Sequence, residues 1–379
     1  MKSFVYLDHA ATSPLRPEAR DAWLRASELG GNASSVHAIG RKAKVLLEDA
    51  RSQILQGLGA EGSGGLVFTS GGTEANSLAL HQLYFGEMLG SSLIVSAGEH
   101  DSIYSVANGA EIVPLAAAGH VDLGGLSLRL EACKARPFVC LMLANNETGA
   151  VSDVAAAARI VHEKKGWLHV DAVQALGKIE IDFNKLDADS LSVSSHKVGG
   201  PQGVGALIYK RERTLKPLIT GSGQELGLRA GTENVAGISA FAAAFSACQP
   251  MRPELCKAQA EIEAALKAMG VTILGEQAQR LPGLLCLAQP EWASNLQLIH
   301  MDLSGLCVSS GSACSSGKVK SSRVASAIGL SDMADKVLRV SAGWTNSPED
   351  WERFYAVWSD GYNAYLKRRL QTVTVKEKA

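Results

Sequence analysis

Short uninterrupted apolar runs recur through the first half of the chain, and segments of helical periodicity separate them. An uninterrupted run is typical of a strand buried on both faces of a mostly parallel sheet, because a strand with one solvated face alternates apolar and polar residues. The runs that predict such strands lie at 66–69, 92–95, 138–143, 167–170 and 190–193.

Helical patterns lie between these strands. Residues 36–58 carry apolar side chains at intervals of about 3.6 residues, with Arg41, Lys44 and Glu48 mostly on the opposite face. Residues 235–247 repeat this pattern. Strands that alternate with helices indicate an α/β fold, so we predict an open, doubly wound sheet.

The pattern changes at residues 249–253, where two prolines fall within four residues. Beyond this point the sequence predicts a helix at 254–269, short strands at 271–274 and 283–287, and a long helix at about 348–370. This second half is typical of a smaller α+β domain. We predict a large domain over 15–250 and a small domain formed by 1–14 and 251–379.

Charge and cysteine content narrow the class of protein. The 37 Lys and Arg residues nearly balance the 38 Asp and Glu residues, which argues against nucleic acid or anionic lipid as the main partner. The seven cysteines form no C-x-x-C pair, which predicts a reduced, cytoplasmic protein without disulfides or a metal site. The longest uncharged stretch, 235–251, is too short and too mildly apolar to span a bilayer.

The turn Ser70-Gly71-Gly72-Thr73-Glu74 lies between a predicted strand and a helix. Small residues at a helix N-terminus leave backbone N–H groups and the positive end of the helix dipole exposed, which suits a phosphate. The spacing matches neither the P-loop nor the dinucleotide fingerprint. The alternative is an ordinary tight turn in which Thr73 caps the helix.

Two further polar residues follow buried strands. Asp171 ends the run 167–170, where open α/β sheets place functional side chains, although it could also cap the next helix. Lys197 follows the run 190–193 beside Ser195, His196 and glycines, whereas most lysines are surface charges. A phosphate site, a carboxylate for the ring nitrogen and a lysine for the aldehyde are together what pyridoxal phosphate needs.

Cys314 lies within the Ser- and Gly-rich stretch 309–317, which predicts an exposed, mobile loop. A thiol in such a loop has little apolar surface to bury against, so reactivity is the better explanation. Lys318, Lys320 and Arg323 would raise its thiolate fraction. We interpret the other six cysteines as packing residues.

These motifs resemble the cysteine desulfurases, pyridoxal-phosphate enzymes of the class-V aminotransferase group and of the nitrogen-fixation and iron–sulfur-cluster type. The resemblance extends from about Tyr6 to Ser341. The matching segments are 6–12, 31–37, 69–74, 99–100, 145–149, 169–174, 195–197, 223–225, 229–234, 309–314 and 338–341.

The resemblance implies a role for each matching residue. Lys197 holds the cofactor aldehyde and moves the substrate Cα proton, and His100 stacks on the ring and transfers a proton. Asp171 pairs with the ring nitrogen, and Arg339 binds the substrate carboxylate. The remaining implied roles are the ring hydroxyl for Gln174 and Asn146 (the latter also near the substrate), the phosphate for Gly72, Thr73, Ser194 and His196, and the partner subunit's phosphate for Thr232.

The resemblance also implies the fold and the reaction. The fold is that of the type I pyridoxal-phosphate-dependent transferases, with a mostly parallel seven-stranded sheet, helices on both faces and a smaller α+β domain that carries the cysteine loop. L-Cysteine would yield L-alanine and a persulfide on Cys314, which a homodimer with composite active sites passes to a sulfur acceptor such as an iron–sulfur scaffold.

The sequence leaves two alternatives to the function of a cysteine desulfurase. A selenocysteine lyase on the same scaffold is the first, although the long loop after Cys314 favours cysteine. A catalytically silent sulfur carrier or assembly scaffold is the second, and the presence of Lys197, Asp171, His100 and Cys314 argues against it.

The sequence departs from the family pattern at four positions, with His9 in place of Asn, Ala33 in place of Pro, Ser222 in place of Gly and Ser321 in place of Pro.

Overall fold

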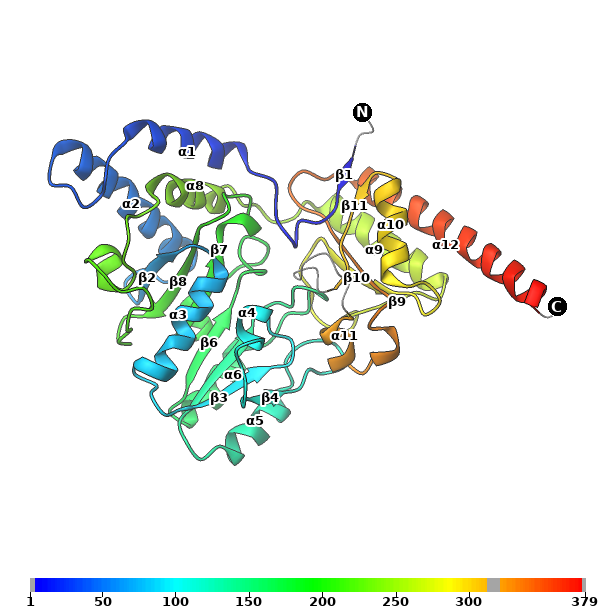
Figure 1. Ribbon diagram of the computed structural model, residues 1–379, viewed down its shortest axis with the longest axis horizontal. Coiled ribbons are helices and arrows are strands. Elements are labelled where there is room, and N and C mark those ends of the chain that lie inside the picture. The colour runs from blue at the N-terminus through cyan, green and yellow to red at the C-terminus, as the bar shows by residue number, and fades with distance from the viewer. Residues whose placement is uncertain (1–3, 312–320, 377–379) are drawn as a thin grey trace.

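The computed structural model describes residues 4–311 and 321–376. Its largest element is a seven-stranded sheet with the strand order β2-β8-β7-β6-β5-β3-β4 (Figure 1). The strands are β2 (Gly64–Thr69), β3 (Ser92–Ser96), β4 (Glu111–Val113), β5 (Pro137–Met142), β6 (Trp167–Asp171), β7 (Ser190–Ser194) and β8 (Gly205–Lys210).

Most neighbouring strands of this sheet are parallel, as predicted. The pairs β4–β3, β3–β5, β5–β6 and β6–β7 are parallel, whereas β8 runs antiparallel to both β7 and β2. The five strands expected from apolar runs are confirmed within one to three residues at their ends. The apolar pattern did not predict β4, which has only three residues, or β8.

Helices cover both faces of the sheet. Along β5, Val139 and Leu141 join the apolar cluster formed with α2, α6 and α8, whereas Phe138 and Cys140 join the cluster formed with α3. Successive side chains of a strand point to opposite faces, so the uninterrupted run reflects burial on both sides. The helices are α1 (Pro17–Leu29), α2 (Ala38–Gly57), α3 (Gly72–Phe85), α4 (Asp101–Tyr104), α5 (Leu123–Ala132), α6 (Val154–Glu163), α7 (Phe183–Leu186) and α8 (Val235–Ser246).

The C-terminal part of the chain forms a smaller α+β unit on one side of this sheet (Figure 1). Its core contains the buried Trp351, Phe354 and Trp358 of α12, packed with α9 and the strands β10 and β12. The N-terminal strand β1 pairs in parallel with β11. The elements are β1 (Val5–Tyr6), β9 (Thr272–Ile273), β10 (Leu284–Ala288), β11 (Leu306–Cys307), β12 (Val337–Ser341), α9 (Pro253–Ala268), α10 (Ser294–Leu303), α11 (Arg323–Ala327) and α12 (Pro348–Lys376).

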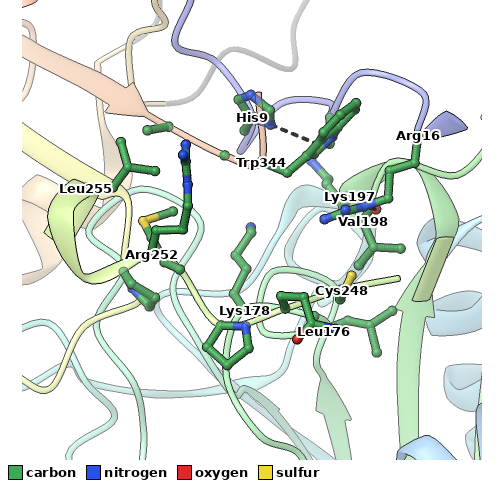
Figure 2. A pocket seen from close by; sticks show the side chains of 18 residues that line it. His9, Arg16, Leu176, Lys178, Lys197, Val198, Cys248, Arg252, Leu255 and Trp344 are labelled. Atoms are coloured by element: carbon green, nitrogen blue, oxygen red, sulfur yellow. Dashed lines mark hydrogen bonds between the residues drawn. The ribbon is translucent and has the colours of Figure 1, made fainter. Parts of the chain in front are cut away.

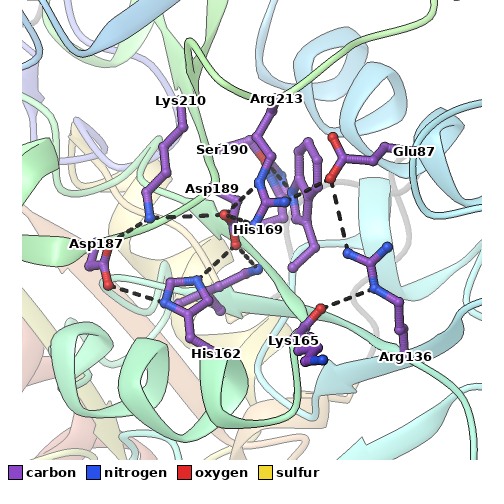
Figure 3. Close-up of polar contacts among 12 residues, drawn as sticks. Glu87, Arg136, His162, Lys165, His169, Asp187, Asp189, Ser190, Lys210 and Arg213 are labelled. Carbon is purple, nitrogen blue, oxygen red and sulfur yellow. Dashed lines mark hydrogen bonds and ion pairs between the residues drawn. The ribbon is translucent and has the colours of Figure 1, made fainter.

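A buried ion network fixes the amino ends of β6 and β7 (Figure 3). Asp189, fully buried, accepts hydrogen bonds from the backbone N–H of Leu168 at 2.7 Å, from His162 Nε2 at 3.0 Å and from Arg213 Nη2 at 2.7 Å. These partners hold the pKa of Asp189 below its ordinary value despite burial. The network lies at the opposite strand ends from Asp171 and Ser194. In the described part of the chain no helix is long and apolar enough to cross a membrane.

Candidate active site

The carboxyl ends of β6 and β7 and the start of α3 surround one cavity of about 240 Å³, here called the Asp171 cavity. Asp171 is the last residue of β6, Ser194 is the last residue of β7, and a single turn of 3-10 helix carries Ser195–Lys197 directly after it. The predicted site residues that line the cavity are Gly72, Thr73, His100, Asn146, Asp171, Gln174, Ser194, His196, Lys197 and Arg339.

At one end of the cavity, α3 begins with Gly72 after the cap residue Gly71, which offers no side-chain cap. The alternative in which Thr73 caps this helix is therefore wrong. A Cβ on Gly72 would lie 2.7 Å from Val173 Cγ2, so glycine lets the helix start approach the sheet closely. The first backbone N–H groups of a helix have no partner within the helix, which gives this end of the cavity the donors that a phosphate needs.

Asp171 also lines this cavity and is buried, with 3 % of its surface exposed. Its Oδ1 accepts the backbone N–H of Val173 at 2.9 Å, and its Oδ2 accepts the side-chain amide of Asn76, also at 2.9 Å. Hydrogen bonds to a carboxylate stabilise its charged form. No helix begins at Asp171, because residues 173–178 form a turn and the next helix, α7, is capped by Asp182. The helix-capping alternative for Asp171 is therefore wrong, and its carboxyl group lines the cavity.

A chain of hydrogen bonds fixes the orientation of Asn76. Trp167 Nε1 donates to Ser190 Oγ at 2.9 Å, and Ser190 Oγ lies 2.9 Å from His169 Nδ1. His169 Nε2 lies 3.0 Å from Asn76 Oδ1, which can only accept, so this nitrogen carries the proton. Burial lowers the pKa of His169 to about 3, which keeps the ring neutral. Asn76 is thereby held with its amide donors toward Asp171.

The second donor of the same amide reaches the histidine predicted to stack on the ring. Asn76 Nδ2 donates to Ser102 Oγ at 2.9 Å, and Ser102 Oγ lies 2.9 Å from His100 Nδ1. The backbone N–H of Ser102 also points to His100 Nδ1, at 3.1 Å. Because a backbone N–H can only donate, Nδ1 is an acceptor and the proton of the neutral ring lies on Nε2.

Glu99, the residue before His100, is buried to 1 % exposure. Burial and the nearby Asp171 raise its pKa to about 8. The carboxyl group of Glu99 is therefore protonated at neutral pH. The sequence interpretation assigned Glu99 to a family motif without giving it a role.

Lys197 projects into the cavity beside the N-terminal segment. Its Nζ donates to the carbonyl oxygens of Ala10 at 2.6 Å and Ala11 at 2.8 Å. The Ala10 carbonyl also accepts Gln174 Nε2 at 2.7 Å, so the segment after β1 holds two of the predicted cofactor residues. Burial, followed by the charge of Lys197, lowers the pKa of His196 to about 4 and keeps this ring neutral.

Arg339 is 3 % exposed and lines the same cavity from β12. Its Nη1 donates to the Asn146 carbonyl at 2.9 Å, and its Nη2 donates to Asp8 Oδ1 at 3.1 Å. Its Nε is buried without a hydrogen-bond partner among the described residues. An unsatisfied guanidinium donor in a cavity wall fits an incoming carboxylate.

The chain on either side of the undescribed residues 312–320 lies next to this site. Ser309 exchanges backbone hydrogen bonds with Arg339, at 3.0 and 2.7 Å, and Ser322 Oγ donates to the buried carboxylate of Glu147 at 2.5 Å. Cys314, the predicted sulfur acceptor, falls outside the described residues. Its segment therefore leaves and rejoins the described structure beside Arg339 and Glu147.

Thr232 does not line the Asp171 cavity of its own chain. It is exposed and borders a separate small cavity of about 70 Å³ together with Ser70 and Arg229. Arg229 Nε donates to Glu74 Oε1 at 2.9 Å, which ties this segment to the first turn of α3.

Sequence reasoning missed Asn76 and Ser102, which both line the Asp171 cavity. A signal was available for Asn76, because it lies three residues after Thr73 and such a spacing places two side chains on one helix face. The connection of Asn76 to Asp171 spans 95 residues and has no signal in a single sequence.

The donor set fits pyridoxal phosphate. The cavity supplies a helix N-terminus with Ser194 and His196 for a phosphate, a charged carboxylate for a ring nitrogen and an amine for an aldehyde. These groups stand at separate positions around one cavity, as a flat ring with a phosphate at one end requires.

Comparison with known proteins gives one consistent family. Residues 5–354 match the model of the family described as Aminotransferase class-V. Over 366 residues the chain is 36% identical to "Cysteine desulfurase IscS" of Dictyoglomus turgidum, covering 92% of each chain. It is 33% identical over 391 residues to "Putative cysteine desulfurase NifS" of Bacillus subtilis, covering 97% of this chain and 98% of that protein.

Solved structures share the same architecture. A NifS-like protein from Rickettsia africae superposes with a TM-score of 0.87 at 32% identity, covering 95% of this chain and 99% of the other. The structure titled "SspA in complex with cysteine" superposes with a TM-score of 0.76 at 27% identity, covering 89% of this chain and 98% of the other. The predicted α/β fold is confirmed by these likenesses.

Proposed function

The chain belongs to the aminotransferase class-V family, and from this premise we propose that it is a pyridoxal-phosphate-dependent cysteine desulfurase. The observation that carries the proposal is the Asp171 cavity, where ten residues named from sequence motifs meet around one space. Their groups match the cofactor at one end and a small amino-acid substrate at the other.

The cofactor would be held by residues of the large sheet. Asp171 would pair with the ring nitrogen and keep it protonated, and hydrogen bonds from Asn76 and Val173 hold its carboxyl group in position. The α3 N-terminus, with Ser194 and His196, binds the phosphate, and Lys197 binds the aldehyde. When bound, pyridoxal phosphate supplies an electron sink for the pair left on the substrate Cα after proton loss.

The substrate would be oriented by Arg339. This guanidinium is locked by Asn146 and Asp8 and has one buried donor left for a carboxylate. Lys197 Nζ would remove and return the proton at Cα, and the Nε2–H of His100 would donate a hydrogen bond on the face of the cavity that it lines. A single ring tautomer of His100 makes that donor available without rearrangement.

Cys314 would receive the sulfur. Its thiolate attacks the substrate sulfur, the Cβ–S bond breaks as an S–S bond forms, and the electron pair of the broken bond stays with the substrate carbon. A proton at that carbon completes L-alanine, and Cys314 carries the persulfide. The support is the position of Ser309 and Ser322, on either side of the segment, at the wall that contains Arg339.

We propose a homodimer with composite sites. Thr232 is exposed in its own chain, and its neighbour Leu226 exposes 74 % of its surface. On α2 and just before it, Ile39 and Val36 are 49 % and 88 % exposed. Exposed large apolar side chains are typical of an interaction surface, and a second copy of the chain would cover them.

The persulfide would be passed to an acceptor protein such as an iron–sulfur scaffold. Sulfur transfer of this kind requires thiols that are not lost to disulfides, and the six cysteines within the described residues are all free. The proposal therefore keeps the cytoplasmic location predicted from the sequence.

The test is direct. The purified protein should be yellow and should release alanine from L-cysteine, and Lys197→Ala should abolish the release. A colourless protein that cannot be reconstituted with pyridoxal phosphate would overturn the proposal. The relatives above carry the names cysteine desulfurase and putative cysteine desulfurase, and these names do not favour the selenocysteine lyase alternative. An enzyme that releases alanine from L-selenocysteine and not from L-cysteine would support that alternative instead.

A further inference from the structure

A second cavity of about 270 Å³ adjoins the Asp171 cavity and shares Lys197 with it. It is here called the Lys178 cavity. Figure 2 shows the Lys178 side chain extending into this space, with Arg252 on one side and Lys197 and Arg16 on the other. None of the roles proposed above for the reaction involves Lys178, Arg16 or Arg252.

The cations of this cavity are held by neutral oxygens. Arg16 Nε donates to the Val198 carbonyl at 2.9 Å, and Lys178 Nζ donates to Gln174 Oε1 at 2.7 Å. Arg252 Nη2 donates to a backbone carbonyl, and its Nη1 lies 3.6 Å from Glu254, with both side chains about half exposed. Such an exposed pair neutralises little charge.

No carboxylate belongs to the described lining of the cavity, whereas four lysine and arginine side chains do. These positive charges contribute to the lowered pKa values of Lys178 and His9. Burial, followed by the charges of Lys197 and Arg339, lowers the pKa of Lys178 to about 7. Burial, followed by Lys178 and Arg16, lowers the pKa of His9 to about 4. A concentration of positive charge in a concave, partly desolvated space attracts an anion.

The walls between these cations are largely apolar. Leu176, Val198, Met251, Leu255 and Trp344 contribute to them. An inorganic oxyanion would leave this surface uncovered, whereas an organic anion with a short apolar part would cover it and still reach Lys178.

Besides the shared Lys197, a hydrogen bond to Gln174 connects the Lys178 cavity to the cofactor side. Gln174 Oε1 accepts a hydrogen bond from the Lys178 ammonium, and Gln174 also lines the Asp171 cavity. An anion that draws Lys178 toward itself would therefore change the hydrogen bonding of Gln174.

We infer that the Lys178 cavity is a binding site for a small organic carboxylate, separate from the site of the substrate carboxylate at Arg339. The carboxylate contacts Lys178 and Arg252, and its apolar part lies against Leu255 and Trp344. Its occupation is sensed at the cofactor through Gln174.

The experiment measures butyrate binding to the holoenzyme by isothermal titration calorimetry. Four variants are compared: Lys178→Met and Arg252→Gln in the cavity, Lys185→Met as a control whose side chain is 78% exposed, and Arg339→Gln in the substrate site. Losing one charged hydrogen-bond donor is expected to weaken butyrate about tenfold or more in each cavity variant. Lys185→Met should bind it as the unmodified protein does, and Arg339→Gln should retain binding.

Three results would overturn the inference. They are the absence of butyrate binding to the unmodified holoenzyme, unchanged binding in both Lys178→Met and Arg252→Gln, and loss of binding in Arg339→Gln with retention in the cavity variants. Inorganic phosphate and butyramide are tested in parallel. Phosphate that binds more tightly than butyrate, or butyramide that binds equally, would contradict the class of ligand. The readout does not depend on turnover, so its failure is distinguishable from failure of the proposed function.

Discussion

Asn76 donates its side-chain amide to Asp171 Oδ2 at 2.9 Å, across 95 residues of sequence. The same amide nitrogen donates to Ser102, which contacts His100. One side chain thus connects the carboxylate proposed for the ring nitrogen with the histidine proposed to stack on the ring. Its orientation is fixed from behind by the neutral His169.

Replacing Asn76 should therefore weaken the cofactor site. Asn76→Leu removes a donor from a buried carboxylate, and we expect the dissociation constant of pyridoxal phosphate to rise about tenfold or more. Absorbance titration of the apoprotein with cofactor measures this constant without turnover. Ser77→Ala is the matched control, because Ser77 is the next residue of α3 and its hydroxyl contacts only the Thr73 carbonyl within the helix. Equal constants for both variants would refute the role of Asn76.

Glu99 predicts a specific dependence of stability on pH. Its folded-state pKa of about 8 lies above the ordinary value of 4.5, so the folded chain binds this proton more tightly than the unfolded chain. The contribution of Glu99 to folding is therefore greatest below pH 4.5 and is lost as pH rises to about 8. A glutamine at position 99 does not titrate. Urea denaturation of Glu99→Gln should therefore lack the part of the fall in unfolding free energy that Glu99 causes between pH 4.5 and about 8.

The control for Glu99 is Glu261→Gln, whose side chain is 66% exposed and ion-paired with Lys257. It should keep the slope of the unmodified protein. A Glu99→Gln variant whose stability falls as steeply as that of the unmodified protein between these pH values would show that Glu99 is charged at neutral pH.

The network around Asp189 predicts a large loss of stability. Asp189→Asn leaves the Arg213 guanidinium and Lys210 without their shared buried carboxylate, and breaking such a buried ion pair costs about 3–5 kcal/mol. Denaturation at neutral pH measures the change. Lys257→Ala, which breaks an exposed pair on α9, should cost less than about 1 kcal/mol. Comparable losses in the two variants would contradict the importance of the network.

Composite sites predict recovery on mixing two inactive chains. Lys197→Ala removes the amine of one site, and Thr232→Val removes a phosphate contact from the partner's site. A mixed dimer contains one site with both residues intact, so mixed chains should regain up to half of the alanine release per dimer. Recovery is measured after subunit exchange. Sites contained within single chains would give no recovery beyond the average of the two parents.

The fold was predictable because its strands are buried on both faces. The uninterrupted runs ending near Asp171 and Ser194 identify β6 and β7, and turn residues placed Gly72 at the start of α3. The strand β8, Gly205–Lys210, was missed although its apolar run is as uninterrupted as those of the predicted strands. The helix α12 continues six residues beyond the predicted end at Leu370. The division of the chain near residue 250 stays a prediction.

The sequence motifs predicted which residues form the candidate site. They did not predict the long-range contacts that hold these residues in position. Asp171 ends β6 and Lys197 follows the end of β7 by one short turn, and these positions indicated that the two side chains meet. The anchoring of Arg339 by Asp8 joins residues 331 positions apart and depends on the pairing of the N-terminal segment with β12. The Lys178 cavity likewise depends on segments that lie far apart in the sequence. A single sequence carries no signal for such long-range contacts.

The central claim is that Cys314 takes sulfur from L-cysteine. The most direct measurement is mass spectrometry of the peptide that contains Cys314, after the holoenzyme has reacted with L-cysteine and been alkylated without reductant. We expect the peptide to carry an added sulfur atom on Cys314, and we expect no added sulfur in the Cys314→Ser and Lys197→Ala variants. Alanine release with no added sulfur on Cys314, or undiminished sulfur release by Cys314→Ser, would contradict it.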